Sequence, residues 1–348
     1  MLSINSNFES GNIIVKSIQD NHAYLEIKKD PYIKDQKQKK YQYWFYFKAN
    51  NVLNEKHTFI IQNLQIIPNP WDKNNDWHGL NICYSYDNKK WKRCKTVFTG
   101  SEIHWTIKPT KNIIWFAYYP PYTFSRTKKL FGNDKIIGYS HQKNPIYMKT
   151  IGKGPITVWV IARQHPGETI GSWMMEGFLK RVKQLGKKLS KHYTIKMIGN
   201  ANPDGTILGH WYTNAKGLNL NRDWANTESK EIKCIKKEFE RKNKCDLFFD
   251  LHGDEGSFEH FLVASYANKN ILHNTINKYL NEKNENFRED NFYPEYYMRN
   301  AQGSADDFSK GITVEGAMKH KINGNTIQNE PLEIGKNLAD ILNILQKK

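Results

Sequence analysis

Beyond residue 150, apolar runs of strand length alternate with stretches of helical periodicity, and this alternation constrains the fold more than any other feature of the chain. Residues 156–161 are continuously apolar, as in a strand that is buried on both faces. In residues 169–186, apolar side chains recur at intervals of three and four residues, which predicts an amphipathic helix. Further strands are predicted at 194–198, 246–251, 260–264 and 312–314, and further helices at 228–242, at 269–283 and from Pro331 onward. This order of elements predicts an α/β domain over residues 126–348.

Residues 1–125 have a different pattern of apolar and turn-forming residues. Short segments rich in aromatic and β-branched residues are separated by turn-forming clusters, as at 43–47, 58–61, 80–84 and 113–118. No long helical periodicity interrupts them. We therefore expect an antiparallel β-sandwich or barrel domain that precedes the α/β domain, with the boundary between residues 125 and 126.

The composition excludes several classes of protein. A hydrophobic content of 39% with 13% aromatic residues can fill a core, which argues against global disorder. No apolar run approaches 18 residues, so no membrane span is expected. The first residues lack a basic stretch followed by an apolar one, which favours a cytoplasmic protein. Only 4 cysteines occur and none are spaced as Cys-x-x-Cys, so neither a disulfide scaffold nor a thiolate zinc site is expected.

The chain is strongly basic. Lys and Arg total 52 against 35 for Asp and Glu, which gives a net charge of +17. Both halves share this excess, and zinc-finger spacing and RNA-binding aromatic motifs are absent from the sequence, so a nucleic-acid partner is not expected. The charge is compatible with an acidic peptide partner and equally with a well-solvated basic surface.

Residues that can bind a metal follow three of the predicted strands, where ligands bind in α/β sheets. His165 and Glu168 follow the first strand in the turn His-Pro-Gly-Glu, His252 follows the strand 246–251, and Glu315 follows 312–314. The spacing His-x-x-Glu is common by chance, but its place at a strand end makes it informative. Two histidines and one glutamate, with a fourth position open, are typical of a catalytic zinc site. We therefore predict that His165, Glu168 and His252 bind a metal.

Five motifs in the C-terminal part resemble those of the zinc metallocarboxypeptidases, and in particular those of the cytosolic carboxypeptidase subfamily. They occur in that family's order: His165-Pro-Gly-Glu168, Asn202-Pro-Asp-Gly205, Gly217-Leu-Asn-Leu-Asn221-Arg222-Asp-Trp224, Asp250-Leu-His252-Gly-Asp-Glu255 and Thr313-Val-Glu315. The N-terminal part also resembles that subfamily's accessory domain, at Phe8-Glu-Ser-Gly-Asn12, Tyr84-Ser-Tyr-Asp87 with Trp91, and Ala117-Tyr-Tyr-Pro-Pro-Tyr122. The resemblance covers nearly the whole chain, and it implies an antiparallel β-sandwich domain followed by a mixed-sheet α/β domain.

The resemblance implies a metallocarboxypeptidase with one Zn²⁺ per chain, which hydrolyses the C-terminal peptide bond of peptides or protein tails. Glu315 would be the general base for the attacking water. Asn221 and Arg222 would hold the C-terminal carboxylate of the substrate, a role that suits the planar guanidinium of arginine. Many cytosolic relatives remove C-terminal glutamate, so an acidic tail is a candidate substrate.

The sequence departs from the family pattern at two positions. Tyr212 stands where the family usually has the arginine that stabilises the oxyanion, and we expect Tyr212 to take this catalytic position as an uncharged donor. Losing one such donor costs about 10²–10³ in rate in other enzymes. Asn219 stands where an aspartate often orients a zinc-bound histidine, and its amide oxygen can still accept that hydrogen bond.

Several assignments stay open at this point. Tyr293, Tyr296 and Tyr297 are equal candidates for the tyrosine that the family places near the leaving group. Arg299 is a candidate substrate-binding residue for an acidic side chain, with Lys310 as a second cation. Because of Tyr212, two other functions are kept beside the peptidase. One is a zinc amidohydrolase acting on a non-standard amide or cell-wall peptide, and the other is a non-catalytic zinc protein that binds acidic C-termini.

Overall fold

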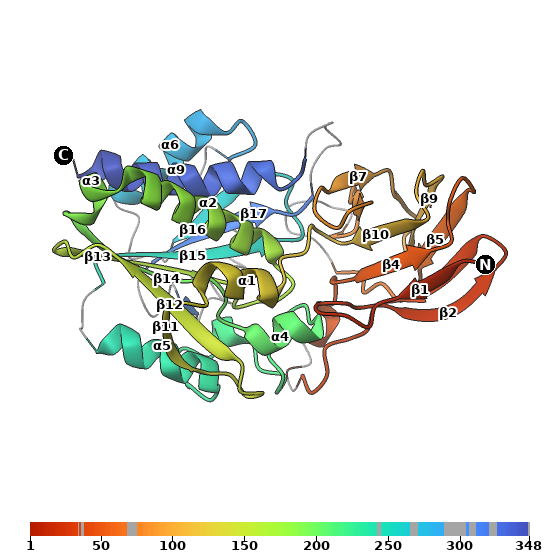
Figure 1. Ribbon diagram of the computed structural model, residues 1–348, viewed down its shortest axis with the longest axis horizontal. Coiled ribbons are helices and arrows are strands. Elements are labelled where there is room, and N and C mark those ends of the chain that lie inside the picture. Colours follow the sequence, from red (N-terminus) through yellow and green to blue (C-terminus); the bar gives the residue numbers. More distant parts are fainter. Residues whose placement is uncertain are drawn as a thin grey trace.

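The computed structural model describes residues 1–33, 35, 38–67, 75–241, 245–264, 271–288, 304–305, 311–319 and 326–346. Its strands form two five-stranded sheets and one seven-stranded sheet. The five-stranded sheets contain β1 to β10 and make up what we call the N-terminal β unit. The seven-stranded sheet contains β11 to β17 and, with its helices, makes up the C-terminal α/β unit. The two units lie side by side along the long axis of the molecule (Figure 1).

The N-terminal β unit confirms the predicted sandwich. One sheet has the order β1 (Ser3–Asn5), β4 (Tyr46–Asn50), β10 (Ile113–Ala117), β6 (Ile82–Ser85) and β7 (Lys92–Cys94). The other has the order β2 (Ile14–Gln19), β3 (His22–Glu26), β5 (His57–Ile61), β9 (Ile103–Ile107) and β8 (Val97–Phe98). Neighbouring strands are antiparallel with one exception, because β3 and β5 pair in parallel. A short 3₁₀-helix, η1 (Gln38–Lys40), lies in the connection that follows β3.

Aromatic side chains fill the space between these two sheets. Phe59 of one sheet and Phe116 of the other have ring centroids 4.7 Å apart, and Trp105 packs 5.4 Å from Phe116. All three residues are almost completely buried. Strand residues alternate between the two faces of a sheet, so the aromatic pattern that predicted these strands also supplies the sandwich core.

The C-terminal α/β unit is built on a mixed sheet with the strand order β11-β12-β14-β13-β15-β17-β16. The strands are β11 (Lys135–Tyr139), β12 (Pro145–Ile151), β13 (Ile156–Ala162), β14 (Tyr193–Ile198), β15 (Leu247–Asp254), β16 (Phe261–Ala264) and β17 (Ile312–Ala317). The central strands β14, β13, β15 and β17 are parallel, and the outer ones pair antiparallel. The helices are α1 (Phe124–Phe131), α2 (Thr169–Leu185), α3 (Lys187–Ser190), α4 (Pro203–Leu208), η2 (Leu220–Arg222), α5 (Lys230–Glu240), α6 (Ile271–Lys283) and α9 (Asn329–Leu345).

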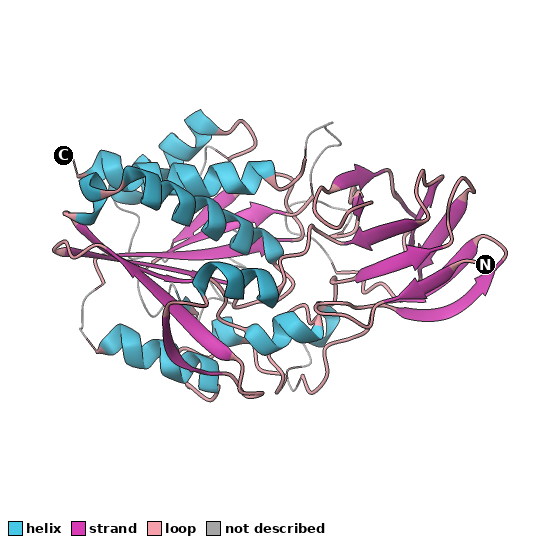
Figure 2. Ribbon diagram, in the orientation of Figure 1, coloured by secondary structure: helices cyan, strands magenta, loops and turns pink. Residues whose placement is uncertain are grey.

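Helices cover both faces of this sheet, whereas strands make up the N-terminal β unit (Figure 2). Along β13, Val158 and Val160 belong to the core that includes α2 and α9, while Trp159 and Ile161 belong to the core that includes α5. This explains why residues 156–161 are continuously apolar, because both faces of the strand are buried. Among the described helices, none combines the length and apolar character needed to cross a bilayer.

The structure corrects some element boundaries. β15 extends to Asp254, so His252 lies inside a strand and does not follow it. The segment after Pro120-Pro121 forms α1, where the Thr123 hydroxyl caps the helix by accepting a hydrogen bond from the backbone N–H of Arg126. Strands β11 and β12 were not predicted either, because their sequences contain lysine, threonine and glycine and lack a continuous apolar run.

A buried carboxylate ties α1 to α2. Glu176 of α2 is 4% exposed and accepts hydrogen bonds from Arg126 Nε at 2.9 Å and from the Tyr122 hydroxyl at 3.0 Å. Lys180 Nζ lies 2.7 Å from the other carboxylate oxygen. Burial alone would raise the pKa of Glu176, but its hydrogen bonds to Arg126 and Lys180 outweigh burial and lower the pKa.

We expect Glu176→Gln to lower the free energy of unfolding at neutral pH by about 1–3 kcal/mol, as for hydrogen bonds to charged groups. A carboxylate whose pKa is lowered by folding adds stability above its unfolded pKa and loses it as the pH falls through the folded value. The difference between wild type and variant should therefore shrink below about pH 4. Urea unfolding at pH 7 and pH 3.5 measures this. A difference that is the same at both pH values would contradict the assignment.

Candidate metal centre and active site

The three side chains predicted to bind a metal lie together near the carboxyl ends of the central parallel strands. His165 and Glu168 are in the turn between β13 and α2, and His252 lies in β15, which neighbours β13. All three are buried, and one ligand atom from each lies within 4.8 Å of the others. His165 Nδ1 is 2.7 Å from Glu168 Oε1, and His252 Nδ1 is 2.8 Å from Glu168 Oε2. Both imidazoles therefore present the same nitrogen to the carboxylate.

Each imidazole turns its other nitrogen toward an oxygen outside this cluster. His165 Nε2 is 3.0 Å from Asn219 Oδ1, and His252 Nε2 is 3.0 Å from Asp250 Oδ2. The Asn219 and Asp250 oxygens favour a proton on each Nε2, while the amide nitrogens of Asn221 and Gln164 also lie 3.1 and 3.4 Å from His252 Nε2. A proton on Nε2 leaves the Nδ1 lone pair directed into the cluster. Asn219 makes the contact that was expected of its amide oxygen. Two imidazole nitrogens and one carboxylate, oriented in this way, are a donor set that fits Zn²⁺.

The cluster also has the electrostatics of a cation site. Burial by itself would raise the pKa of Glu168, but the charges of His165 and His252 and their hydrogen bonds lower it to about 2. Burial opposes a charge on His252, yet Asp250 and Glu168 raise the pKa of this imidazole well above its ordinary value. A positive charge is thus strongly favoured among these side chains, as either a proton or a metal ion.

A buried arginine braces the turn that carries two of the three side chains. Arg163 has a φ of 63° and donates hydrogen bonds to the Tyr122 carbonyl at 2.8 Å and to the Pro166 carbonyl at 2.5 Å. The backbone N–H of Gly167 donates to the Trp211 carbonyl at 2.9 Å. A Cβ atom at Gly167 would lie 2.3 Å from the Trp211 ring, so only glycine allows this close approach.

Glu315 stands directly beside the cluster on the neighbouring strand. In the parallel ladder between β15 and β17, Glu315 is in register with His252. Burial raises the pKa of Glu315 well above its ordinary value, His252 opposes this, and Glu168, Asp254 and Asp250 add to it. A carboxylate with a raised pKa beside a cation site is typical of a general base.

Asn221 and Arg222 lie in and at the end of η2, close to the same cluster. Asn221 is buried, and its Nδ2 is 3.1 Å from His252 Nε2. The Asn221 side-chain oxygen accepts a hydrogen bond from the backbone N–H of Ala305 at 2.9 Å. Arg222 is partly exposed and donates to the Asn221 carbonyl at 2.6 Å. No ion pair to Arg222 occurs within the part of the chain that the structure describes, so this guanidinium can meet an incoming carboxylate.

Tyr212 packs face to face on one of the cluster histidines. Its ring centroid is 4.1 Å from that of His165, with an interplanar angle of 19°. On its other side, Tyr41 of the N-terminal β unit stacks at 5.7 Å with an angle of 23°. Burial raises the pKa of the Tyr212 phenol, which is therefore uncharged. The contact of Tyr212 with the cluster is therefore the packing of its ring on the His165 ring.

Arg299, Lys310 and the three tyrosines 293, 296 and 297 lie outside the described residues. The assignments made for them stay predictions.

Two family models match the chain in the order expected from its motifs. A model of the cytosolic carboxypeptidase N-terminal domain matches residues 4–119, and a model of zinc carboxypeptidase matches residues 133–318, more than half of the 348 residues. The chain belongs to the zinc carboxypeptidase family. As a zinc carboxypeptidase it is a metallopeptidase, a hydrolase that acts on peptide substrates.

Comparisons with individual proteins agree with this family assignment. An uncharacterised protein of Zymomonas mobilis is 31% identical over 76% of this chain and 70% of its own length. Cytosolic carboxypeptidase 1 of Xenopus laevis is 25% identical over 66% of this chain, which spans only 23% of the Xenopus protein. A metallo-carboxypeptidase from Pseudomonas aeruginosa, solved in complex with (2-guanidinoethylmercapto)succinic acid, matches over 99% of both chains with a TM-score of 0.84 and 25% identity.

Sequence reasoning missed some residues that shape this carboxypeptidase site. Asp250 faces His252 from two residues earlier in β15, and side chains two apart on a strand share a face, so the spacing alone could have indicated it. Gln164 donates to Asp250 Oδ2 at 2.6 Å, and the Trp224 indole donates to Gln164 at 2.7 Å. Tyr41 has no sequence signal, because it comes from the other unit.

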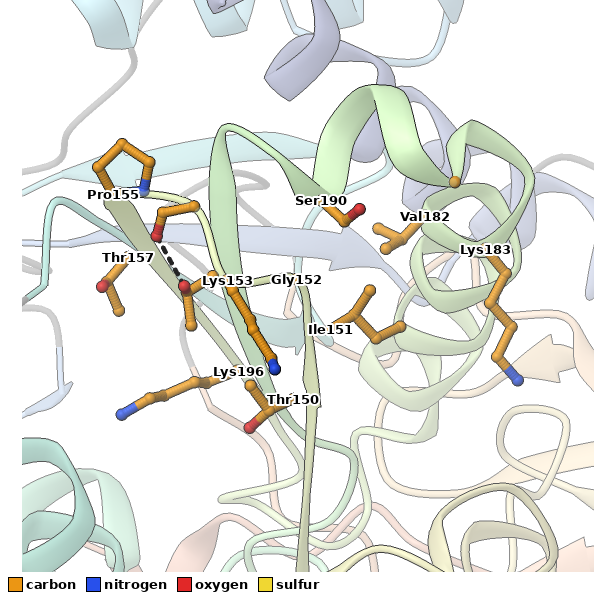
Figure 3. A pocket seen from close by; sticks show the side chains of 13 residues that line it. Thr150, Ile151, Gly152, Lys153, Pro155, Thr157, Val182, Lys183, Ser190 and Lys196 are labelled. Atoms are coloured by element: carbon orange, nitrogen blue, oxygen red, sulfur yellow. Dashed lines mark hydrogen bonds between the residues drawn. The ribbon is translucent and has the colours of Figure 1, made fainter.

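A separate cavity lies at the other end of the parallel strands, near where β13 and β14 begin. It has a volume of about 1140 Å³ and is lined by residues from the end of β12, the beginnings of β13 and β14 and the last turn of α2. Three lysines, Lys153, Lys183 and Lys196, are among them (Figure 3). The cluster lies beyond the other end of β13, so this cavity is not part of the metal centre. Its Lys196 is buried, with the ammonium 4.5 Å from the Trp159 ring centroid.

Proposed function

We propose that this chain removes single residues from the C-termini of peptides or protein tails, with one Zn²⁺ held by His165, Glu168 and His252. The observation that carries the proposal is the buried cluster of these three side chains with Glu315 in register on the adjacent strand. When bound there, zinc polarises the scissile carbonyl and lowers the pKa of a water molecule. We also propose a cytoplasmic location, which the names of the matched cytosolic carboxypeptidases support.

The chain's own residues divide the remaining tasks. Glu315 takes a proton from the attacking water and passes it to the nitrogen of the leaving residue. Arg222, with Asn221 beside it, pairs with the terminal carboxylate of the substrate, which restricts cleavage to the last peptide bond. The Tyr212 hydroxyl acts as an uncharged donor at the position where the family usually has an arginine.

The proposal is tested with one peptide in two forms, with a free C-terminal carboxylate and with a C-terminal amide. Mass spectrometry should detect the loss of one residue at a time from the first form only. A zinc chelator should abolish this release, and added zinc should restore it. Equal cleavage of both forms would refute the carboxylate contact and favour the amidohydrolase. Zinc binding without cleavage of either form would favour the non-catalytic binder.

We further propose that the preferred tails are acidic, with glutamate as the residue removed. The net charge of +17 is compatible with this preference, and the observation that supports it is a cation near the site. Lys40 Nζ lies 5.6 Å from the centroid of the Tyr41 ring, and Tyr41 stacks on Tyr212. Lys40 is exposed, so it can meet an acidic side chain of a bound tail at little desolvation cost.

Reversing this charge should change substrate selection. We expect Lys40→Glu to lower kcat/KM about tenfold for a glutamate-rich tail and less than twofold for a neutral tail, since a charge at the rim acts mainly on association. The matched control is Lys48→Glu, because Lys48 also lies over an aromatic ring, that of Trp115, within the N-terminal β unit. Parallel assays with the two tails measure the effect. An equal loss on both tails would contradict the proposed contact.

A further inference from the structure

One carboxylate of the N-terminal β unit reaches into the site of the C-terminal unit. Asp30 follows β3 and is 7% exposed. Its Oδ1 accepts a hydrogen bond from the backbone N–H of Trp211 at 2.8 Å, and its Oδ2 accepts from those of Tyr212 at 2.8 Å and Thr213 at 3.0 Å. The Thr213 hydroxyl is 3.2 Å from the same Oδ2. One side chain thus satisfies three consecutive backbone donors in a segment without regular secondary structure.

The segment bound by Asp30 contacts the metal cluster in two ways. The Tyr212 ring packs on His165 with a centroid distance of 4.1 Å. The Trp211 carbonyl accepts the hydrogen bond from Gly167, which lies between His165 and Glu168 in the sequence. Fixing residues 211–213 therefore fixes the orientation of one cluster imidazole and the turn that carries two cluster side chains.

Asp30 is itself held firmly within its own unit. Its backbone N–H donates to Gln42 Oε1 at 2.7 Å. Two residues earlier, Lys28 exchanges a pair of hydrogen bonds with Asn12, at 2.8 and 2.9 Å. Asn12 also donates to the Gly209 carbonyl at 2.7 Å, just before the bound segment. The position of Asp30 is therefore set by the sandwich and transmitted to the C-terminal unit.

We propose that Asp30 is a positioning residue of the metal centre, acting through residues 211–213 and the Tyr212 ring on His165. This rests on the proposed function only in taking His165 as a metal ligand. It assigns to the N-terminal β unit a part in the site itself: the sandwich supplies the carboxylate that holds one wall of the site in place. Residues that orient metal ligands typically contribute 10- to 100-fold to metal affinity.

The test measures the zinc dissociation constant of the full chain by competition with a chromophoric chelator. Asp30→Asn keeps the shape of the side chain but replaces one acceptor by a donor facing backbone N–H groups, and we expect zinc to bind about tenfold more weakly. The matched control is Ser10→Gly, which removes a 2.7 Å hydrogen bond from the Ser10 hydroxyl to the Thr206 carbonyl at the same interface. Ser10 has a φ of 65°, which glycine accepts, and this control should change zinc binding less than twofold.

A double-mutant cycle isolates the route through the ring. In a Tyr212→Leu background, Asp30→Asn should weaken zinc binding by no more than about threefold, because the ring that it positions is gone. The proposal is overturned if Asp30→Asn leaves zinc affinity unchanged. Its route through the Tyr212 ring is overturned if the full tenfold effect persists in the Tyr212→Leu background, where the contact of the Gly167 N–H with the Trp211 carbonyl remains. A wild-type chain that fails to bind zinc would instead overturn the proposed function, so the two failures are distinguishable.

Discussion

Replacing Glu315 by Gln is expected to lower kcat/KM for C-terminal residue release by roughly 10²–10⁴-fold while leaving zinc binding intact. The amide has nearly the same shape as the carboxylate but cannot accept the proton of the attacking water. Glu315 is not among the three clustered side chains, so the metal site should keep its donors. Steady-state kinetics with a free C-terminal peptide, together with measurement of the metal content, separates the two effects.

Glu255 provides a matched control for this prediction. Burial raises the pKa of Glu255 well above its ordinary value, as it does for Glu315, and the charges of Asp76 and Asp254 add to the effect. Glu255 lies one residue beyond the end of β15, not in register with His252. We expect Glu255→Gln to cost less than tenfold. If both variants lose activity equally, or if Glu315→Gln retains full activity, the assignment of the general base is wrong.

Replacing Tyr212 by arginine is expected to raise kcat by up to about 10²–10³-fold. This upper bound is the effect of one donor to a developing oxyanion in other enzymes, and the Tyr212 hydroxyl already supplies part of it. Burial is the main cause of the raised pKa of Tyr212. Among the nearby charges, Arg222 lowers this pKa, whereas Glu255 and Glu168 raise it. A guanidinium at position 212 would therefore meet two attractive carboxylates and one repulsive cation. It can also stack on the His165 ring in place of the phenol, because arginine packs on aromatic faces.

Tyr212→Phe is the control for this substitution, because it keeps the stack on His165 and removes only the hydroxyl. If the hydroxyl donates to the oxyanion, Tyr212→Phe should lower kcat at least tenfold. A gain in Tyr212→Arg from undetectable activity would identify the natural chain as a binder of C-termini. No gain from arginine would contradict the placement of position 212 at the oxyanion and would weaken the non-catalytic reading.

Much of the C-terminal unit could be predicted because its signals are local. The apolar run of β13 and the periodicity of α2 each lie within one segment, and the turn between them carries His165 and Glu168. The placement of His252 near that turn follows from the rule that parallel strands end at a common edge. The end of β15 was placed three residues too early, at residue 251. The reason is that Gly253 and Asp254, which continue the strand, are residue types that are rare in strands.

The features that escaped prediction depend on partners far away in the sequence. Strands β3 and β5 pair in parallel, and nothing in the residues of either strand indicates whether its neighbour runs parallel or antiparallel to it. Asp30 acts on residues more than 180 positions later, and nothing near it in the sequence distinguishes it from a solvated turn aspartate. Tyr212 could be singled out as a departure from the family, but its face-to-face packing on His165 is a matter of geometry that spacing does not determine.

The hydrogen bonds from residues 211–213 to Asp30 have a consequence for how such enzymes can evolve. Recombination between distant relatives commonly exchanges whole folding units at their linkers. Here an exchange that brought in a sandwich without an acidic side chain at the place of Asp30 would leave three backbone N–H groups without acceptors beside the metal site. The two halves are therefore expected to be inherited as one piece, with the first half carrying part of the selective constraint on hydrolysis.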